Sequence, residues 1–174
     1  MENLNNYIPT LHEAKKYIDN FNFNRIINKM VLVDGWIIND AIDTCEMYRN
    51  FIFLKKKYPN IVNIVPSKDI DEFWHCHILA TQDYKIFSDN IFGKNHFLHH
   101  YPFFGIDGKS NMNDVTDAFS VTQELYYKEF LTKINPTRSK FPKLVYYFLK
   151  KMSNFHSEKE KKSNINDNLN VADV

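Results

Sequence analysis

Five of the seven histidines in this chain fall between His75 and His100. Two of them stand in the run Asp71-Glu-Phe-Trp-His75-Cys-His77, and the pair His99-His100 follows further along. Histidine is the side chain that most often binds a metal, and imidazole together with a carboxylate suits zinc, non-haem iron, copper or nickel. The stretch therefore predicts a transition-metal site, with zinc or iron as the favoured ion.

The spacing limits which of these side chains can meet. Residues two apart on a helix diverge by about 200°, so His75 and His77 cannot both reach one ion from a regular helix. Asp71 lies four residues before His75, where a carboxylate can act as a ligand or as a hydrogen-bond partner of one. His99 and His100 point apart in extended backbone. The simplest predicted site contains Asp71, either His75 or His77, and one or both of His99 and His100.

Other interpretations apply to some of these residues. His77 falls on the apolar face of its helix, where a core histidine is as good an explanation as a ligand. His96 reads as a surface residue, and Cys76 as a small buried hydrophobe rather than a thiolate ligand. Three protein ligands with an open position would indicate a catalytic site, whereas four closed ligands would indicate a structural one. The alternatives are therefore a small metal-dependent enzyme and a non-catalytic interaction module whose histidines, with any bound metal, stabilise the fold.

Composition excludes several broad classes of protein. With 174 residues, of which 44% are hydrophobic and 16% aromatic, the chain is typical of one folded domain. The net charge of +1 gives no field for nucleic acid, so we expect a small-molecule or peptide substrate instead. No apolar run is long enough to span a membrane. The two cysteines and the lack of a signal-like start predict a soluble cytoplasmic protein without disulfides.

Helical periodicity and capping residues dominate the chain. They predict a mainly α, single-domain bundle of about five helices over residues 1–152, with a short irregular loop of aromatic residues and histidines, and a disordered polar tail over 153–174. Thr10 and Ser67 are the clearest N-caps. Residues 31–33 read as extended, and 61–65 as a short strand or buried loop. The expected helices cover about 11–30, 40–58, 68–92, 114–131 and 139–152.

Part of the chain, from Trp36 to Phe130, resembles the glycine-rich domain-containing protein-like family. The resemblance rests on Trp36, Tyr48-Arg-Asn-Phe51, Val65-Pro66, Asp69-Ile-Asp71-Glu-Phe-Trp74-His75-Cys-His77 and Tyr84. The elements His99-His100-Tyr-Pro102 and Phe104-Gly105 are similar to its bacterial, stand-alone branch. The resemblance implies a mainly helical domain but no mechanism, and this chain, with four glycines, lacks the glycine-rich region. The signature positions it implies are Asp71, Trp74, His75, His77, Tyr84, His99 and His100.

Overall fold

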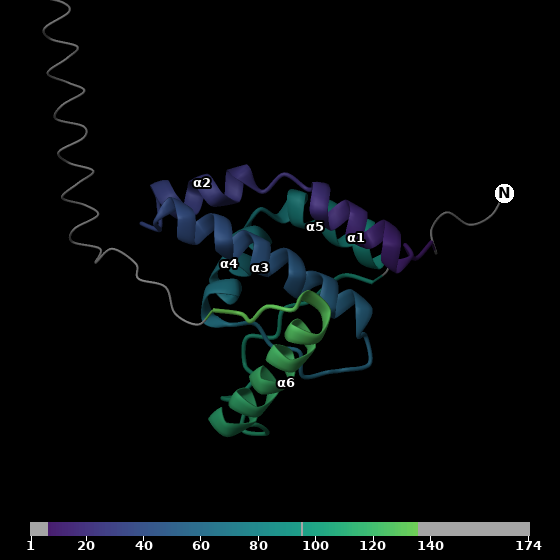
Figure 1. Ribbon diagram of the computed structural model, residues 1–174, viewed down its shortest axis with the longest axis vertical. Coiled ribbons are helices and arrows are strands. Elements are labelled where there is room, and N and C mark those ends of the chain that lie inside the picture. Colours follow the sequence, from purple (N-terminus) through teal and green to yellow (C-terminus); the bar gives the residue numbers. More distant parts are fainter. Residues whose placement is uncertain (1–6, 95, 136–174) are drawn as a thin grey trace, which may run out of the picture.

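The computed structural model describes residues 7–94 and 96–135 (Figure 1). Within them the chain forms helices and no strand, which confirms the expected mainly α bundle. The helix expected over 139–152 and the tail from residue 153 lie outside the described residues. No helix in the described part combines the length and the apolarity needed to cross a membrane. The helices are α1 (Leu11–Asn20), α2 (Asn24–Leu32), α3 (Ile38–Lys57), α4 (Lys68–Leu79), α5 (Thr81–Phe92) and α6 (Met112–Phe130).

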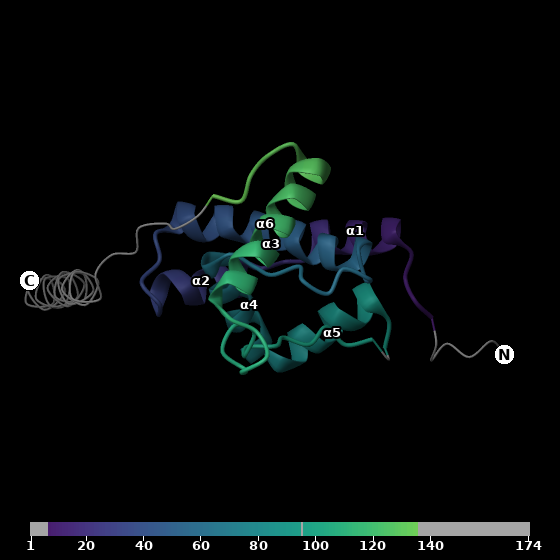
Figure 2. The same cartoon turned by 90° about the horizontal axis from the view of Figure 1, so that it is seen from below.

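Helix α3 is the centre of the bundle. It packs against α1, α2, α4 and α6, while α5 packs against α1 and α4. Figure 1 shows α1 and α2 along one side of α3 and α6 leaving on the other, and Figure 2 gives the same arrangement from below. The core is aromatic, since Tyr48 and Phe51 of α3, Phe73 of α4 and Phe87 of α5 are all fully buried. Burial of these rings is the main source of stability.

The single helix expected over 11–30 is two helices with a break at 21–23. Phe21 is extended, and its ring packs on that of Phe23 with 4.7 Å between centroids. The guanidinium of Arg49 on α3 donates hydrogen bonds to the carbonyl oxygens of Ile18 and Phe21, so the end of α1 is capped from another helix. Residues 31 and 32, expected to be extended, instead complete the last turn of α2.

A second unexpected break divides the helix expected over 68–92. Ala80, with φ −82° and ψ 62°, separates α4 from α5. The break brings Trp74 and Tyr84 together, with the indole Nε1 of Trp74 2.9 Å from the Tyr84 hydroxyl. On one continuous helix these ten residues would rise about 15 Å. The turn at Ala80 therefore folds the histidine-bearing helix back against the helix that leads to the His99-His100 loop.

Candidate metal centre

Asp71 and His75 on α4 meet His100 from the loop after α5. One possible ligand atom from each of the three lies within 4.8 Å of the other two. The carboxylate is in contact with both rings, because His100 Nε2 is 2.7 Å from Oδ1 and His75 Nδ1 is 3.7 Å from Oδ2. The two imidazole rings are 4.5 Å apart between centroids. Two nitrogens and one oxygen from two separate elements thus form a cluster that could hold a metal ion.

The cluster opens to solvent on one side. The side chain of His100 is 13% exposed, that of Asp71 33% and that of His75 49%. His100 is therefore the enclosed member and His75 the accessible one. Three protein ligands with a solvent-facing side leave a coordination position for water or substrate, as in catalytic zinc sites and in iron sites with two histidines and one carboxylate.

His77 is not part of this cluster. It lies on the opposite face of α4, fully buried, with its Nδ1 3.0 Å from the hydroxyl of Tyr48. Burial lowers the pKa of His77 to about 4, so the ring is neutral near pH 7. Its neighbours are the rings of Phe21, Phe23, Tyr84 and Phe87.

His99 also points away from the cluster. Its ring is exposed and packs on Phe97, with 4.9 Å between centroids. Adjacent side chains in extended backbone face opposite ways, so only one member of the pair reaches Asp71. That member is His100. The structure therefore gathers Asp71, His75 and His100, and places His77 and His99 elsewhere.

A hydrogen-bonded clamp holds the loop that carries His100. The Tyr84 hydroxyl accepts from Trp74 Nε1 and donates to the carbonyl oxygen of Leu98 at 2.6 Å, and the Leu98 amide donates to Ser88 Oγ at 2.9 Å. The Trp74 indole then packs edge-on against His100, 4.6 Å between centroids. Burial raises the pKa of Tyr84 to about 12, so its hydroxyl keeps its proton. The sequence gives no signal for Ser88, because a lone serine in a helix is unremarkable.

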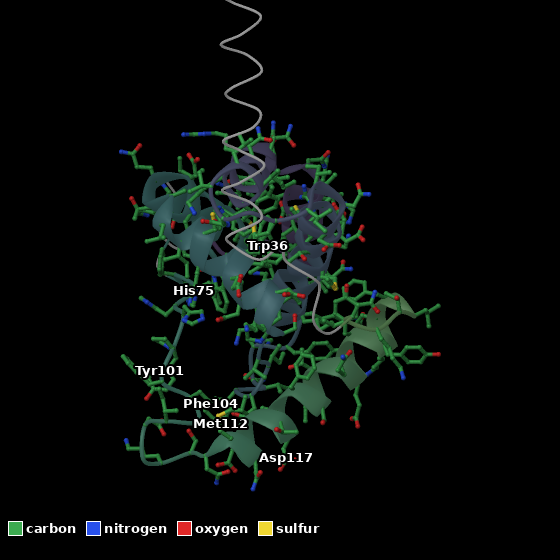
Figure 3. The ribbon with its side chains drawn as sticks, turned by 90° about the vertical axis from the view of Figure 1, so that its left-hand side faces the viewer. Trp36, His75, Tyr101, Phe104, Met112 and Asp117 are labelled. Atoms are coloured by element: carbon green, nitrogen blue, oxygen red, sulfur yellow. The ribbon has the colours of Figure 1, made fainter. Side chains whose placement is uncertain are left out.

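The loop beyond His100 is ordered by Asp107. Its Oδ1 accepts hydrogen bonds from the Lys109 amide and from both the amide and the hydroxyl of Ser110, and its Oδ2 accepts one from the Tyr101 hydroxyl. These bonds, with that of the Ser110 hydroxyl foremost, lower the pKa of Asp107 to about 2. Figure 3 shows Tyr101 between His75 and the start of α6. The residue that follows His100 is thus tied to the loop rather than to α4.

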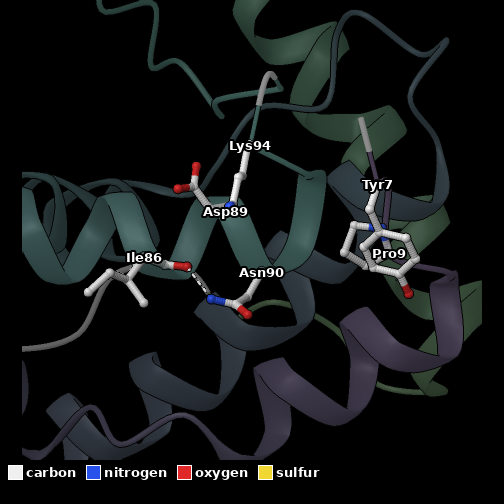
Figure 4. Close-up of a pocket in the computed structure, with 6 residues that line it drawn as sticks. All are labelled: Tyr7, Pro9, Ile86, Asp89, Asn90 and Lys94. Carbon is white, nitrogen blue, oxygen red and sulfur yellow. Dashed lines mark hydrogen bonds between the residues drawn. The ribbon is translucent and has the colours of Figure 1, made fainter. Parts of the chain in front are cut away.

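Two hollows in the described part of the chain differ in their relation to this cluster. One, of about 200 Å³, lies between α2 and α4 and has His75 in its wall. The other, of about 250 Å³, lies where the segment before α1 passes α5 (Figure 4). It is lined by Tyr7, Pro9, Ile86, Asp89, Asn90 and Lys94, and none of these belongs to the cluster. Only the first hollow adjoins the candidate metal centre.

Comparison with known proteins gives a family. The model of the family named UCP032817-like matches residues 13–148, and the chain belongs to that family. The expected membership of the glycine-rich domain-containing protein-like family is therefore wrong. Two of the residues that carried that resemblance, Trp74 and Tyr84, are buried packing positions. No curated protein and no solved structure matches the chain.

Proposed function

We propose that this member of the UCP032817-like family binds one transition metal ion, zinc or iron, through Asp71, His75 and His100, and that it is a small metal-dependent enzyme. The observation that carries the proposal is the convergence of three ligand atoms within 4.8 Å, on two separate elements. The exposed side of His75 supports a catalytic rather than a closed site.

Metal binding needs only a small rearrangement of the cluster. Ligand atoms about 2.1 Å from a tetrahedral ion lie about 3.4 Å from one another. The Asp71 Oδ1–His100 Nε2 contact at 2.7 Å is shorter than this, so an ion would displace the proton between these two atoms and move them slightly apart, while His75 Nδ1, 3.7 Å from Asp71 Oδ2, would move slightly inward. A bound zinc ion would supply a water of lowered pKa for hydrolysis, and an iron ion would supply open positions for a substrate.

Metal analysis of protein purified without chelator tests the proposal. We expect close to one equivalent of zinc or iron in the native protein and loss of most of it in His75→Ala. His99→Ala is the matched control, because His99 is an exposed histidine in the same loop that does not face Asp71. A native protein without metal, or equal loss in both variants, would contradict the site.

The alternative is a non-catalytic module in which the metal is structural. The Asp71–His100 contact favours it, since a metal there would join the loop to α4. Chelation separates the two roles. Any bound ion stabilises the native state, by about 2.7 kcal/mol at one hundred times its Kd. A catalytic ion should leave a cooperatively folded protein after removal with EDTA, whereas a structural ion should leave none.

We propose the substrate class from the net charge and the compartment from the state of the cysteines. The net charge of +1 offers no field for nucleic acid, so the proposed substrate is a small molecule or a peptide. Cys45 and Cys76 are both buried free thiols, which suits the reducing cytoplasm.

A further inference from the structure

The hollow between α2 and α4 shares one residue with the metal cluster. Its wall on α4 is the face that carries Glu72, His75, Cys76 and Leu79, spaced as residues on one side of a helix. Asp71, four residues before His75, is on the adjoining face. We infer that this hollow binds the apolar part of a small, uncharged ligand of the metal centre. This inference rests on the proposed function for the metal, but the hollow itself does not.

The shape of the hollow favours an apolar body. Its floor is made by Met30, Trp36 and Cys76, which are all almost fully buried, while Leu79 stands 74% exposed at its edge. A ligand covering Leu79 would remove apolar surface from water, which favours binding. The volume of about 200 Å³ is that of a few water molecules and fits a ligand of roughly ten non-hydrogen atoms.

The polar edge of the hollow favours a ligand without net charge. Lys29 on α2 and Asp34 just after it form an ion pair, with 2.8 Å between Nζ and Oδ2. Both charges of this pair therefore already have a counter-charge, Glu72 in the same wall is engaged in an interaction of its own, and an anion or a cation would compete with these contacts. An amide, ester or hydroxyl group can instead accept from Lys29 or donate to Asp34 while the pair stays intact.

His75 places the hollow and the metal side by side. The ring is half exposed, touches Asp71 through Nδ1, and also lines the hollow. Trp36 and His75 line the same hollow, and Figure 3 labels both on the face it presents. One ligand can therefore occupy both places. Its polar end would bind at the open position of the metal, and its apolar end would extend past the ring of His75 and contact Trp36.

The two tryptophans of the sequence provide separate probes of hollow and metal. Trp36 lines the hollow, and Trp74 packs on His100. We would label both with 5-fluorotryptophan, assign them with Trp36→Phe, and record ¹⁹F NMR spectra of the zinc-loaded protein. Benzohydroxamic acid is uncharged near pH 7, would chelate zinc through its two oxygens with release of one proton to solvent, and carries an apolar ring; acetohydroxamic acid is its counterpart without the ring. We expect zinc to shift the Trp74 resonance and acetohydroxamic acid to shift that resonance alone. Benzohydroxamic acid should shift the resonances of both Trp74 and Trp36, and it should bind about tenfold more tightly than acetohydroxamic acid.

Variants and a metal-free titration complete the test. Leu79→Ala should weaken benzohydroxamic acid several-fold and leave acetohydroxamic acid unchanged, whereas Val62→Ala, at another exposed apolar residue, should affect neither. Equal affinities for benzohydroxamic acid and acetohydroxamic acid, together with an unshifted Trp36 resonance, would overturn the inference. If zinc does not shift the Trp74 resonance, the proposed function is wrong. A titration of the metal-free protein with benzamide then tests whether the hollow binds a ligand by itself. Benzamide should shift the Trp36 resonance more than benzoate does. In Asp34→Asn the affinity for benzoate should rise, because Lys29 loses its partner and can pair with the carboxylate. An unmoved Trp36 would overturn the hollow as a binding site.

Discussion

Removing the hydroxyl of Tyr84 should both destabilise the protein and weaken the proposed metal site. In Tyr84→Phe the buried Nε1 of Trp74 loses its acceptor and the carbonyl of Leu98 loses its donor. A buried polar group left without a partner costs about 1–3 kcal/mol. Trp74 is buried and pays that cost in full, while the Leu98 carbonyl is only partly buried and can be reached by water. We therefore expect the free energy of unfolding to fall by about 2–3 kcal/mol.

Urea unfolding followed by circular dichroism measures the first effect. Tyr127→Phe is the matched control, since Tyr127 is half exposed on α6 and its change should stay within about 0.5 kcal/mol. Competition with a chelator measures the second effect. Because the clamp positions the loop that carries His100, Tyr84→Phe should lower metal affinity by at least about tenfold, the usual cost of losing support behind a ligand. An unfolding midpoint equal to that of Tyr127→Phe would refute the clamp.

Three further predictions concern stability. In Gly93→Ala a Cβ would lie 2.8 Å from the Tyr7 carbonyl oxygen, at a residue with φ +95°. The free energy of unfolding measured with urea should therefore fall by about 2 kcal/mol. Gly108→Ala is the control and should lower it less, because φ there is +78° but no atom lies within 4 Å. Arg49→Lys should cost about 1–2 kcal/mol, because an ammonium cannot span the two carbonyls that the guanidinium caps, and an unchanged urea midpoint would contradict this. Burial lowers the pKa of His77 to about 4 from 6.5, so between these values the unfolded chain takes up a proton that the native state does not. The free energy of unfolding should therefore fall by up to about 3 kcal/mol from pH 7 to pH 4 in EDTA, and His77→Phe should lose most of that slope.

Helix caps and periodicity were enough to predict most of the fold. Thr10 forms the expected capping box with Glu13, and Ser67 accepts from the Ile70 amide at the start of α4. The breaks at 21–23 and at Ala80 were missed. The first break depends on a partner distant in sequence, the Arg49 guanidinium, and the second coincides with the hydrogen bond between Trp74 and Tyr84, which lie on either side of it. Local propensity is a weak guide where such tertiary contacts decide.

The cluster itself could be predicted only in part. The four-residue spacing of Asp71 and His75 on a helix was sufficient to place their side chains together. The choice between His99 and His100 was not available, because it depends on how the irregular loop lies against α5. Leu98 is fixed to both Tyr84 and Ser88, and this sets which of the next two rings faces Asp71.

The run from Asp71 to His77 looks like one site but serves two faces of a helix. Asp71 and His75 turn outward to the loop, where they meet His100 and their side chains are partly exposed. His77 turns inward, where burial keeps it neutral and Tyr48 binds its Nδ1. Trp74 connects the two faces, because its ring packs on His100 while its Nε1 is held in the core by Tyr84. His77, two residues from the candidate ligand His75, is therefore not a second candidate ligand, because on a regular helix it belongs to the packing on the opposite face.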